Sequence, residues 1–281
     1  MSYQEKSNLT SKMYVQERGS STAPTLVFLH GGGGAGWMWQ PQVEQLEQDY
    51  HCLVPDLPEH GQSRAIKPFT IKDSAIRIAR IIRQQAHGGK AHIIGISAGA
   101  QIGVELLLSA PELIDHAILS SPLLYPLPTT RFYNPMLMAA TFRGLVQPFK
   151  QNEKYIRFNM KWAAGVPEKY FSQFQENFQQ TTVESFTHVM QENLNFGLPA
   201  GLKSIQMPTL VVVGRKEYRT MRRSARELAR LLPKSQGRMV SLGGRVAWDH
   251  NWNLQAPELF NRMVRAWVED KPLPSELQPL K

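Results

Sequence analysis

Short, continuously apolar runs alternate along this chain with longer segments in which apolar residues recur every three or four positions. An apolar run of four to six residues is typical of a strand buried on both faces, whereas the longer periodicity is typical of a helix that buries one face. The predicted buried strands are residues 25–29, 51–54, 91–94, 116–120 and 209–213. Because alternating strands and helices build a mostly parallel sheet with helices on both faces, the pattern predicts an α/β fold.

The pattern is less regular near the two ends of the chain. Residues 12–18 alternate apolar and polar side chains, which predicts an antiparallel strand at the edge of the sheet. Residues 238–242 indicate a weaker strand, and residues 257–267 a final helix. Thr70 precedes a helical stripe and has an acidic residue three positions later, which predicts a helix N-cap. The proline-containing tail after Lys271 is expected to fray.

Residues 123–203 interrupt the alternation. This segment holds no convincing strand, yet it is rich in large apolar residues, among them Phe132, Tyr133, Phe142 and Trp162. Helices inserted between two strands of a parallel sheet lie above the carboxyl ends of the strands, where such sheets bind ligands. We therefore predict a helical cap at residues 123–203, inserted between two parts of one core at residues 1–122 and 204–281.

The composition indicates one large core and a basic surface. The chain has 281 residues, of which 42% are apolar, and a formal net charge of +9. Much of this charge falls within residues 215–234, where Met221, Ala225 and Leu228 form an apolar stripe. The segment predicts an amphipathic helix with a solvated basic face; the alternative is that this face attracts an anionic substrate or surface. Since no nucleic-acid-binding motif accompanies it, we expect no nucleic-acid partner.

Membrane, redox and metal chemistry are not indicated. No apolar run approaches the roughly 20 residues that a membrane helix needs, and the N-terminal residues lack a hydrophobic signal segment, so we expect a cytoplasmic protein without an integral membrane segment. The single cysteine, Cys52, lies in an apolar run and is expected to be inert core. No cluster of His, Cys and Asp has metal-ligand spacing, so we expect no metal and no cofactor.

The sequence Gly95-Ile96-Ser97-Ala98-Gly99 directly follows the predicted strand 91–94 and directly precedes a helical segment. In this strand-turn-helix setting, Gly-x-Ser-x-Gly holds its serine on a strained turn at the end of the sheet, and the glycines let strand and helix approach closely. Ser97 is therefore a candidate nucleophile.

Three further motifs accompany this turn. They are Leu29-His30-Gly31-Gly32 after the first central strand, the loop PDLPEHGQS at residues 55–63 after the second, and Asp249-His250 near the end of the chain. With the Ser97 turn they resemble the α/β-hydrolase superfamily, specifically its capped, esterase- and lipase-like serine hydrolases. The resemblance covers nearly all of the predicted core and hardly touches residues 123–203.

The resemblance implies a catalytic triad. Ser97 would be the nucleophile, and His250, in the loop beyond the last strand signal, the base that takes its proton. The family's acid follows strand 209–213; many relatives have aspartate there, whereas this chain offers Glu217. Glu217 is thus the expected acid, with a surface ion pair as the alternative interpretation of this residue. Asp249 is the competing acid, although adjacent residues in a loop rarely face each other.

The resemblance also places an oxyanion hole, which needs two backbone N–H groups. By position these belong to Ala98 and Gly32, and Gly31 or Gly33 would serve if the loop were shifted. The glycine run lacks the Gly-Lys-Ser/Thr ending of a phosphate-binding loop. Next to the run are three large residues expected to wall an acyl pocket: Trp37, Met38 and Trp39.

These features predict a cofactor-independent serine hydrolase, a carboxylesterase that cleaves a small or medium apolar ester through an acyl-enzyme. Three alternatives stay open. The same residues in this superfamily also support hydrolysis of amide, thioester or carbon–carbon bonds. The chain could be a catalytically weak, ligand-binding relative, or a lipase that uses its basic helix at a membrane surface. The sequence leaves the substrate and the oligomeric state undecided.

Overall fold

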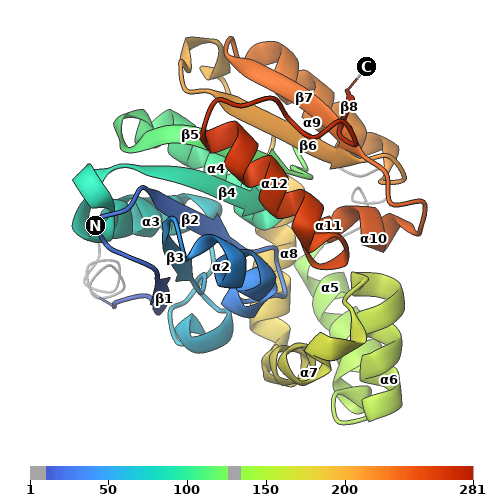
Figure 1. The fold of residues 1–281 in the computed structure, drawn as a ribbon. Coiled ribbons are helices and arrows are strands. Elements are labelled where there is room, and N and C mark those ends of the chain that lie inside the picture. The colour runs from blue at the N-terminus through green and yellow to red at the C-terminus, as the bar shows by residue number, and fades with distance from the viewer. Residues whose placement is uncertain (1–10, 126–133, 281) are drawn as a thin grey trace.

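The computed structural model of the chain describes residues 11–125 and 134–280, and the α/β prediction is confirmed (Figure 1). In these residues eight strands form one sheet, in the order β1-β3-β2-β4-β5-β6-β7-β8. Their bounds are β1 Val15–Arg18, β2 Thr25–Leu29, β3 His51–Pro55, β4 Ala91–Ile96, β5 Ile114–Ser120, β6 Thr209–Gly214, β7 Ser235–Val240 and β8 Gln278–Pro279. The strands from β3 to β7 are parallel, and β1 and β8 are antiparallel to their neighbours at the two edges.

The apolar runs became strands because each side of the sheet is covered by helices. Leu26 and Phe28 belong to the apolar cluster on the side of α2 (Gln40–Leu46) and α12 (Pro257–Val268). Val27 and Leu29 belong to the cluster on the other side, with α3 (Ile71–Gln85), α4 (Ala98–Ser109) and α9 (Arg219–Leu231). Since successive strand residues point to opposite faces, a run without polar positions is what two covered faces require.

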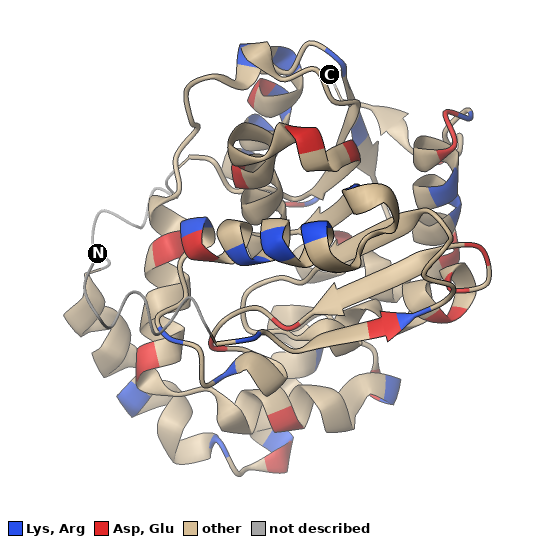
Figure 2. Ribbon diagram, turned by 90° about the vertical axis from the view of Figure 1, so that its left-hand side faces the viewer, with Lys and Arg blue, Asp and Glu red and all other residues tan. Residues whose placement is uncertain are grey.

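Two local predictions about helices are confirmed. The Thr70 hydroxyl oxygen accepts a hydrogen bond of 3.0 Å from the Asp73 N–H and so caps α3. Helix α9 buries Met221, Ala225 and Leu228. The basic charge is not confined to α9, because Figure 2 shows Lys and Arg interspersed with acidic residues over the side of the molecule that carries α3 and β1.

The chain between β5 and β6 is helical where the structure describes it. The longer helices are α5 (Pro135–Thr141), α6 (Glu153–Phe158), α7 (Phe171–Gln180) and α8 (Val183–Asn195), with short 3-10 and π-helical turns between them. They form a group outside the layers that cover the sheet (Figure 1). Phe132 and Tyr133, which we singled out from the sequence, lie outside the described residues.

The end of the chain corrects one prediction. The tail does not fray, because Leu277 is buried in the apolar cluster on the α12 side of the sheet. Gln278 and Pro279 then pair with Met239 and Arg238 as β8. The Leu280 N–H also donates to the carbonyl oxygen of Gly237 at 3.1 Å. The buried Leu277 and the short strand β8 therefore hold the tail against the core, although its proline content is typical of a frayed terminus.

No helix in the two described ranges is both long and apolar enough to cross a membrane.

Two short helices follow β7, namely α10 (Val246–His250) and α11 (Trp252–Gln255). They bring residues 246–255 back to the helical segment, since Asn251 and Gln255 donate side-chain hydrogen bonds of 2.6 Å to the carbonyl oxygens of Ala164 and Gly165.

Candidate active site

Ser97 lies at the turn between β4 and α4 and has φ +55° and ψ −117°. A non-glycine residue with such a φ is strained by about 1–3 kcal/mol and persists only where its surroundings impose it. Here the surroundings are tight: a Cβ on Gly95 would collide with the backbone of Gly99, and one on Gly99 with the carbonyl of Leu29. The glycines on both sides of Ser97 are therefore required by the close approach of β2, β4 and α4.

His250 and Glu217 form a pair at the same end of the sheet. His250 Nδ1 lies 3.2 Å from Glu217 Oε2, and the glutamate side chain is fully buried. The other carboxylate oxygen, Oε1, accepts hydrogen bonds from the Ser121 hydroxyl at 2.6 Å and from the Gly214 N–H at 2.8 Å. The carboxylate is thus fixed from three sides, and a proton on Nδ1 leaves Nε2 of the imidazole as a hydrogen-bond acceptor.

The strand ends connect this pair to Ser97. The Ser97 N–H donates to the carbonyl oxygen of Ser120 at 2.9 Å, and the next residue, Ser121, holds Glu217. Ser97, Ser121 and Glu217 therefore follow the carboxyl ends of the neighbouring strands β4, β5 and β6. Within the described chain no hydrogen bond joins the Ser97 hydroxyl to His250.

Asp249, the competing acid, has a different set of partners. It is completely buried, and its two carboxylate oxygens accept hydrogen bonds from the N–H groups of Lys216 at 2.9 Å and Leu242 at 3.0 Å. These bonds attach the turn after β6 and the segment after β7 to α10. Asp249 thus fixes the loops that carry Glu217 and His250, and both of its oxygens are engaged in doing so.

The glycine run lies beside Ser97 and Ala98. A Cβ on Gly31 would lie 3.4 Å from the Ser97 Cβ, and one on Gly32 would lie 3.9 Å from the Ala98 Cβ. The Gly33 N–H donates to His60 Nε2 at 3.1 Å, and the Gly34 N–H donates to the carbonyl oxygen of Gly31 at 3.2 Å. Because the Gly33 and Gly34 amides are occupied in this way, the N–H groups of Gly31 and Gly32 stay as the candidate donors beside Ala98.

Two buried histidines hold this run against the loop after β3, and we did not identify this role from the sequence. His30 Nε2 accepts from the Leu57 N–H at 3.0 Å, while His60 accepts from Gly33, and the two rings lie 5.0 Å apart. Burial lowers the pKa of His30 to about 4 and that of His60 to about 3. Both rings are therefore neutral at pH 7, which is the form that can accept these hydrogen bonds.

Trp37, Met38 and Trp39, which we expected to wall an acyl pocket, have different surroundings in the structure. Trp39 is completely buried in the core beside Phe28 and Phe260. Met38 is buried in a small apolar cluster with residues of the helical segment, and Trp37 packs against Tyr170 with ring centres 6.0 Å apart. The three consecutive side chains diverge because they form a 3-10 turn, Gly36–Trp39.

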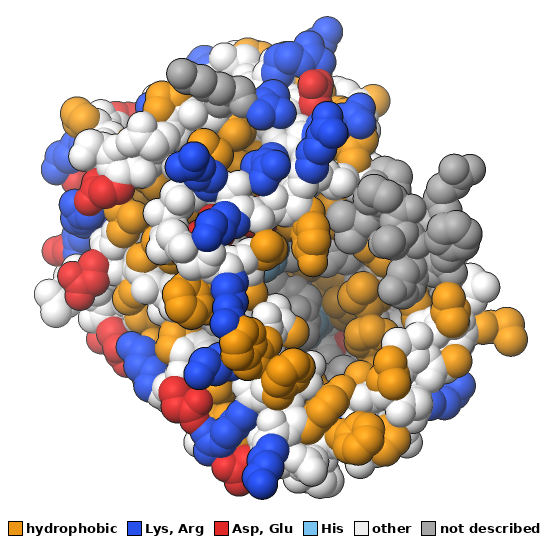
Figure 3. Space-filling view, turned by 90° about the vertical axis from the view of Figure 1, so that its right-hand side faces the viewer, with side chains coloured by type: hydrophobic (Ala, Val, Ile, Leu, Met, Phe, Trp, Pro, Cys, Tyr) orange, Lys and Arg blue, Asp and Glu red, His pale blue; other side chains and the backbone are white. Residues whose placement is uncertain are grey.

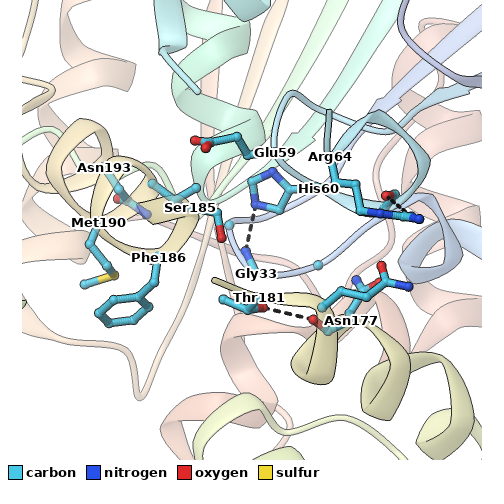
Figure 4. Close-up of a pocket in the computed structure, with 15 residues that line it drawn as sticks. Gly33, Glu59, His60, Arg64, Asn177, Thr181, Ser185, Phe186, Met190 and Asn193 are labelled. Carbon is cyan, nitrogen blue, oxygen red and sulfur yellow. Dashed lines mark hydrogen bonds between the residues drawn. The ribbon is translucent and has the colours of Figure 1, made fainter. Parts of the chain in front are cut away.

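A cavity of about 150 Å³ adjoins the glycine run (Figure 4). Its apolar wall consists of the α8 residues Phe186, Val189 and Met190, and Gly32 and Gly33 form part of the opposite side. Polar side chains complete the lining: Glu59, His60, Arg64, Asn177, Gln180, Thr181, Ser185 and Asn193. Figure 3 shows hydrophobic side chains gathered around a hollow in the face where the helical segment meets the core.

No group of three or more His, Cys, Asp and Glu side chains suited to a metal ion occurs among residues 11–125 and 134–280. The site described above consists of a strained serine, a histidine on a buried carboxylate, and backbone amides beside the serine. Such a set can activate a hydroxyl group and stabilise an oxyanion.

Comparison with known proteins gives the following matches. A family model described as "alpha/beta hydrolase fold" matches residues 24–251. A provisionally named carbamate hydrolase, RutD, of Pseudomonas syringae pv. syringae is 26% identical over 253 residues, which cover 89% of this chain and 95% of that protein. A pimeloyl-(acyl-carrier protein) methyl ester esterase of Vibrio parahaemolyticus is 29% identical over 220 residues, covering 76% of this chain and 84% of that protein.

Among solved structures, a thermophilic esterase from Thermogutta terrifontis superimposes with a TM-score of 0.71 at 18% identity, covering 92% of this chain and 93% of that one. At this identity the likeness is one of fold, and the same fold supports many chemistries.

Proposed function

The chain belongs to the alpha/beta hydrolase family, as the resemblance predicted, and from this premise we propose that it is a serine hydrolase that cleaves carboxylic esters of small or medium size. In this proposal Ser97 is the nucleophile, His250 the base and Glu217 the acid of the triad. Gly32 and Ala98 supply the oxyanion hole. Residues 123–203 serve as the cap over the site, and no cofactor takes part.

The observation that supports this proposal most strongly is the pair of His250 and Glu217. A glutamate buried at the end of β6, fixed by Ser121 and Gly214, presents its second oxygen to the imidazole. A general base needs a partner that fixes its tautomer and stabilises its positive charge when it takes a proton. Glu217 meets this requirement, whereas the carboxylate of Asp249 is occupied by two backbone amides.

The reaction would proceed in two halves. Nε2 of His250 takes the proton of the Ser97 hydroxyl as its oxygen attacks the ester carbonyl, and the resulting oxyanion accepts hydrogen bonds from the N–H groups of Ala98 and Gly32. The imidazolium then gives its proton to the leaving alcohol, which leaves an acyl group on Ser97. A water molecule, deprotonated by His250, releases the acid and restores the serine.

The same machinery would serve other carbonyl compounds. A relative of this chain is named for a carbamate and another for a methyl ester, and both substrates are acyl derivatives with an oxyanion intermediate. We favour an ester because an alkoxide is a better leaving group than an amide nitrogen. A catalytically weak, ligand-binding relative stays the alternative from another class, because no hydrogen bond from Ser97 to His250 occurs in the described chain.

The first test combines labelling with kinetics. A fluorophosphonate probe should label the wild-type protein once, at Ser97, and should not label Ser97→Ala. Hydrolysis of 4-nitrophenyl esters with acyl chains of two to twelve carbons should be lost by about 10⁴-fold or more in Ser97→Ala and in His250→Ala.

Ser109→Ala is a matched control, because this hydroxyl lies at the far end of α4 and donates only to the carbonyl oxygen of Glu105. It should keep both labelling and turnover. A wild-type protein that is neither labelled nor active on any ester of the series would refute the serine hydrolase, and a ligand-binding role would replace it.

A further inference from the structure

Three arginines after β6 border one groove at the surface. Arg215 lies in the turn after β6, and Arg222 and Arg226 lie four positions apart on α9, so their side chains leave the same face of that helix. The groove has a volume of about 510 Å³, and its remaining lining is Met239, Gln278, Pro279 and Leu280. Figure 3 shows Lys and Arg side chains gathered at the top of the molecule, where Figure 1 places α9.

The groove gathers positive charge without a matching acid. Its lining contains no Asp or Glu side chain among the residues that the structure describes. Other surface arginines have carboxylate partners: Arg230 of the same helix lies 2.8 Å from Glu227, and Arg262 lies 2.6 Å from Glu276. Because like charges repel at short range, guanidinium groups that share a groove without an acid favour the binding of an anion.

The backbone holds Arg222 in place. Its Nη1 donates to the carbonyl oxygen of Arg215 at 2.8 Å and to that of Glu217 at 2.7 Å. A guanidinium group has five N–H donors, so these bonds leave further donors of Arg222 for a ligand. Arg222 is half-buried, whereas Arg215 and Arg226 are exposed. The groove therefore combines one cation fixed by the protein with two cations that are accessible to a ligand from solvent.

From these observations we infer that the groove is an anion site for a phosphate group carried on an organic body. The phosphate would accept hydrogen bonds from Arg215, Arg222 and Arg226, because a planar guanidinium group can donate to two phosphate oxygens at once. The organic body would pack against Met239 and Leu280, which are both half-buried. The site goes beyond the proposed hydrolase function, because none of these residues takes part in that reaction.

The lining favours a phosphate over a carboxylate. A phosphate monoester carries a charge of about −1.5 to −2 near pH 7 and has three strong acceptor oxygens, whereas a carboxylate carries one charge on two oxygens. Each of the three guanidinium groups can face its own oxygen of a phosphate. Soluble phosphate esters and phospholipid headgroups share this chemistry, so the test has to distinguish these two sources.

The test measures binding of phenyl phosphate to the protein by isothermal titration calorimetry at low salt. The wild type should bind phenyl phosphate at least about tenfold more tightly than benzoate, which has the same ring and a carboxylate. Inorganic phosphate should bind about threefold more weakly than phenyl phosphate, because it has no body to pack against Met239 and Leu280. The double variant Arg215→Gln/Arg226→Gln should bind phenyl phosphate about tenfold more weakly than the wild type.

Arg230→Gln is the matched control. It removes the same charge from the same helix, but Arg230 does not line the groove, so Kd for phenyl phosphate should stay within about twofold of the wild type. An equal loss in Arg230→Gln and in the double variant would overturn the inference, because it would indicate general attraction by a basic surface. Benzoate bound as tightly as phenyl phosphate would also overturn it. If the double variant does not fold, Arg226→Gln takes its place, with an expected loss of about fivefold.

Two further measurements identify the source of the phosphate and separate the site from the hydrolase. Vesicles of phosphatidylcholine and phosphatidic acid that sediment with the wild type but not with the double variant would identify a lipid headgroup. Binding of phenyl phosphate without such vesicle binding would identify a soluble ester, and either result supports the site. Ser97→Ala should bind phenyl phosphate as the wild type does, even if no ester is hydrolysed. A wild type that binds neither phenyl phosphate nor these vesicles would overturn the inference, even if the esterase is active.

Discussion

Two histidine–glutamate pairs of this molecule look alike and differ in their surroundings. In each pair Nδ1 of a partly exposed histidine faces a fully buried carboxylate, His250 with Glu217 at 3.2 Å and His188 with Glu59 at 2.8 Å. Both oxygens of Glu217 are engaged, whereas one oxygen of Glu59 has no partner within the described residues. Both carboxylates are closed off from solvent, so the two pairs differ in how many donors surround each carboxylate.

The supports of the two glutamates differ as well. Glu217 follows a central strand, and its partners Ser121 and Gly214 belong to the ends of β5 and β6. Glu59 lies in a loop, and its histidine comes from α8 of the helical segment. A group on a rigid strand end keeps its position during a reaction, whereas a contact between loop and inserted helix is where specificity can vary.

The largest expected effect concerns the Glu217 pair. Glu217→Gln should lower kcat for an apolar ester by about 10³- to 10⁴-fold, since the amide no longer stabilises the imidazolium of His250. The corresponding change at the other pair, Glu59→Gln, should leave kcat for the same ester nearly unchanged. Steady-state kinetics of both variants measures the contrast. Equal losses in the two variants would contradict the division of roles.

Acid should destabilise the folded protein through its two buried histidines, His30 and His60. The folded-state pKa values of His30 and His60, about 4 and about 3, lie below the ordinary value of 6.5, so the unfolded chain binds more protons as the pH falls below about 6.5. The free energy of unfolding should therefore decrease by up to about 1.4 kcal/mol per pH unit for each histidine between pH 6 and 5. Urea unfolding at several pH values measures this slope.

His60→Gln should reduce that slope, because one of the two histidines no longer titrates. His87→Gln is the control, since His87 is exposed and its replacement should leave the slope unchanged. A slope that is the same in wild type and His60→Gln would show that the acid sensitivity comes from other groups.

Asp249 should prove to be a structural residue beside the pair of His250 and Glu217. Asp249→Asn replaces one acceptor by an amide NH₂ group that faces the N–H of Lys216 or Leu242, so we expect a loss of about 2–3 kcal/mol in the free energy of unfolding. The kcat of the folded variant should fall by less than about tenfold. A loss of kcat as large as that of Glu217→Gln, with unchanged stability, would make Asp249 the acid.

The smallest effect is expected from Glu59→Gly. Relief of the left-handed conformation favours the folded state by about 1 kcal/mol, and the greater freedom of glycine in the unfolded chain offsets a similar amount. The remaining effect is the loss of the acceptor of the buried Phe69 N–H, about 1–3 kcal/mol, so the midpoint of thermal unfolding should fall by several degrees. A loss of several kcal/mol would mean that Glu59 is mainly a structural contact between the loop and α8.

Much of the fold followed from local sequence. The apolar runs at residues 25–29, 91–94 and 209–213 became central strands, because a strand covered on both faces has no place for a polar side chain. The turn at Ser97 was equally readable, since only small residues fit where β2, β4 and α4 meet. Such features depend on spacing along the chain, which a sequence shows directly.

Long-range packing decided the rest. Which of Glu217 and Asp249 faces His250 depends on how the segments after β6 and β7 fold onto each other. The divergence of Trp37, Met38 and Trp39, and the pairing of β8 with β7, depend in the same way on contacts with distant residues. The contact of Glu59 with His188 joins residues 129 positions apart. The sequence alone determined the strands, the strained turn at Ser97 and the family, because periodicity and local crowding are properties of neighbouring residues. The tertiary structure alone decided how the carboxylates pair and what lines the cavity, because buried polar groups find their partners across the whole chain.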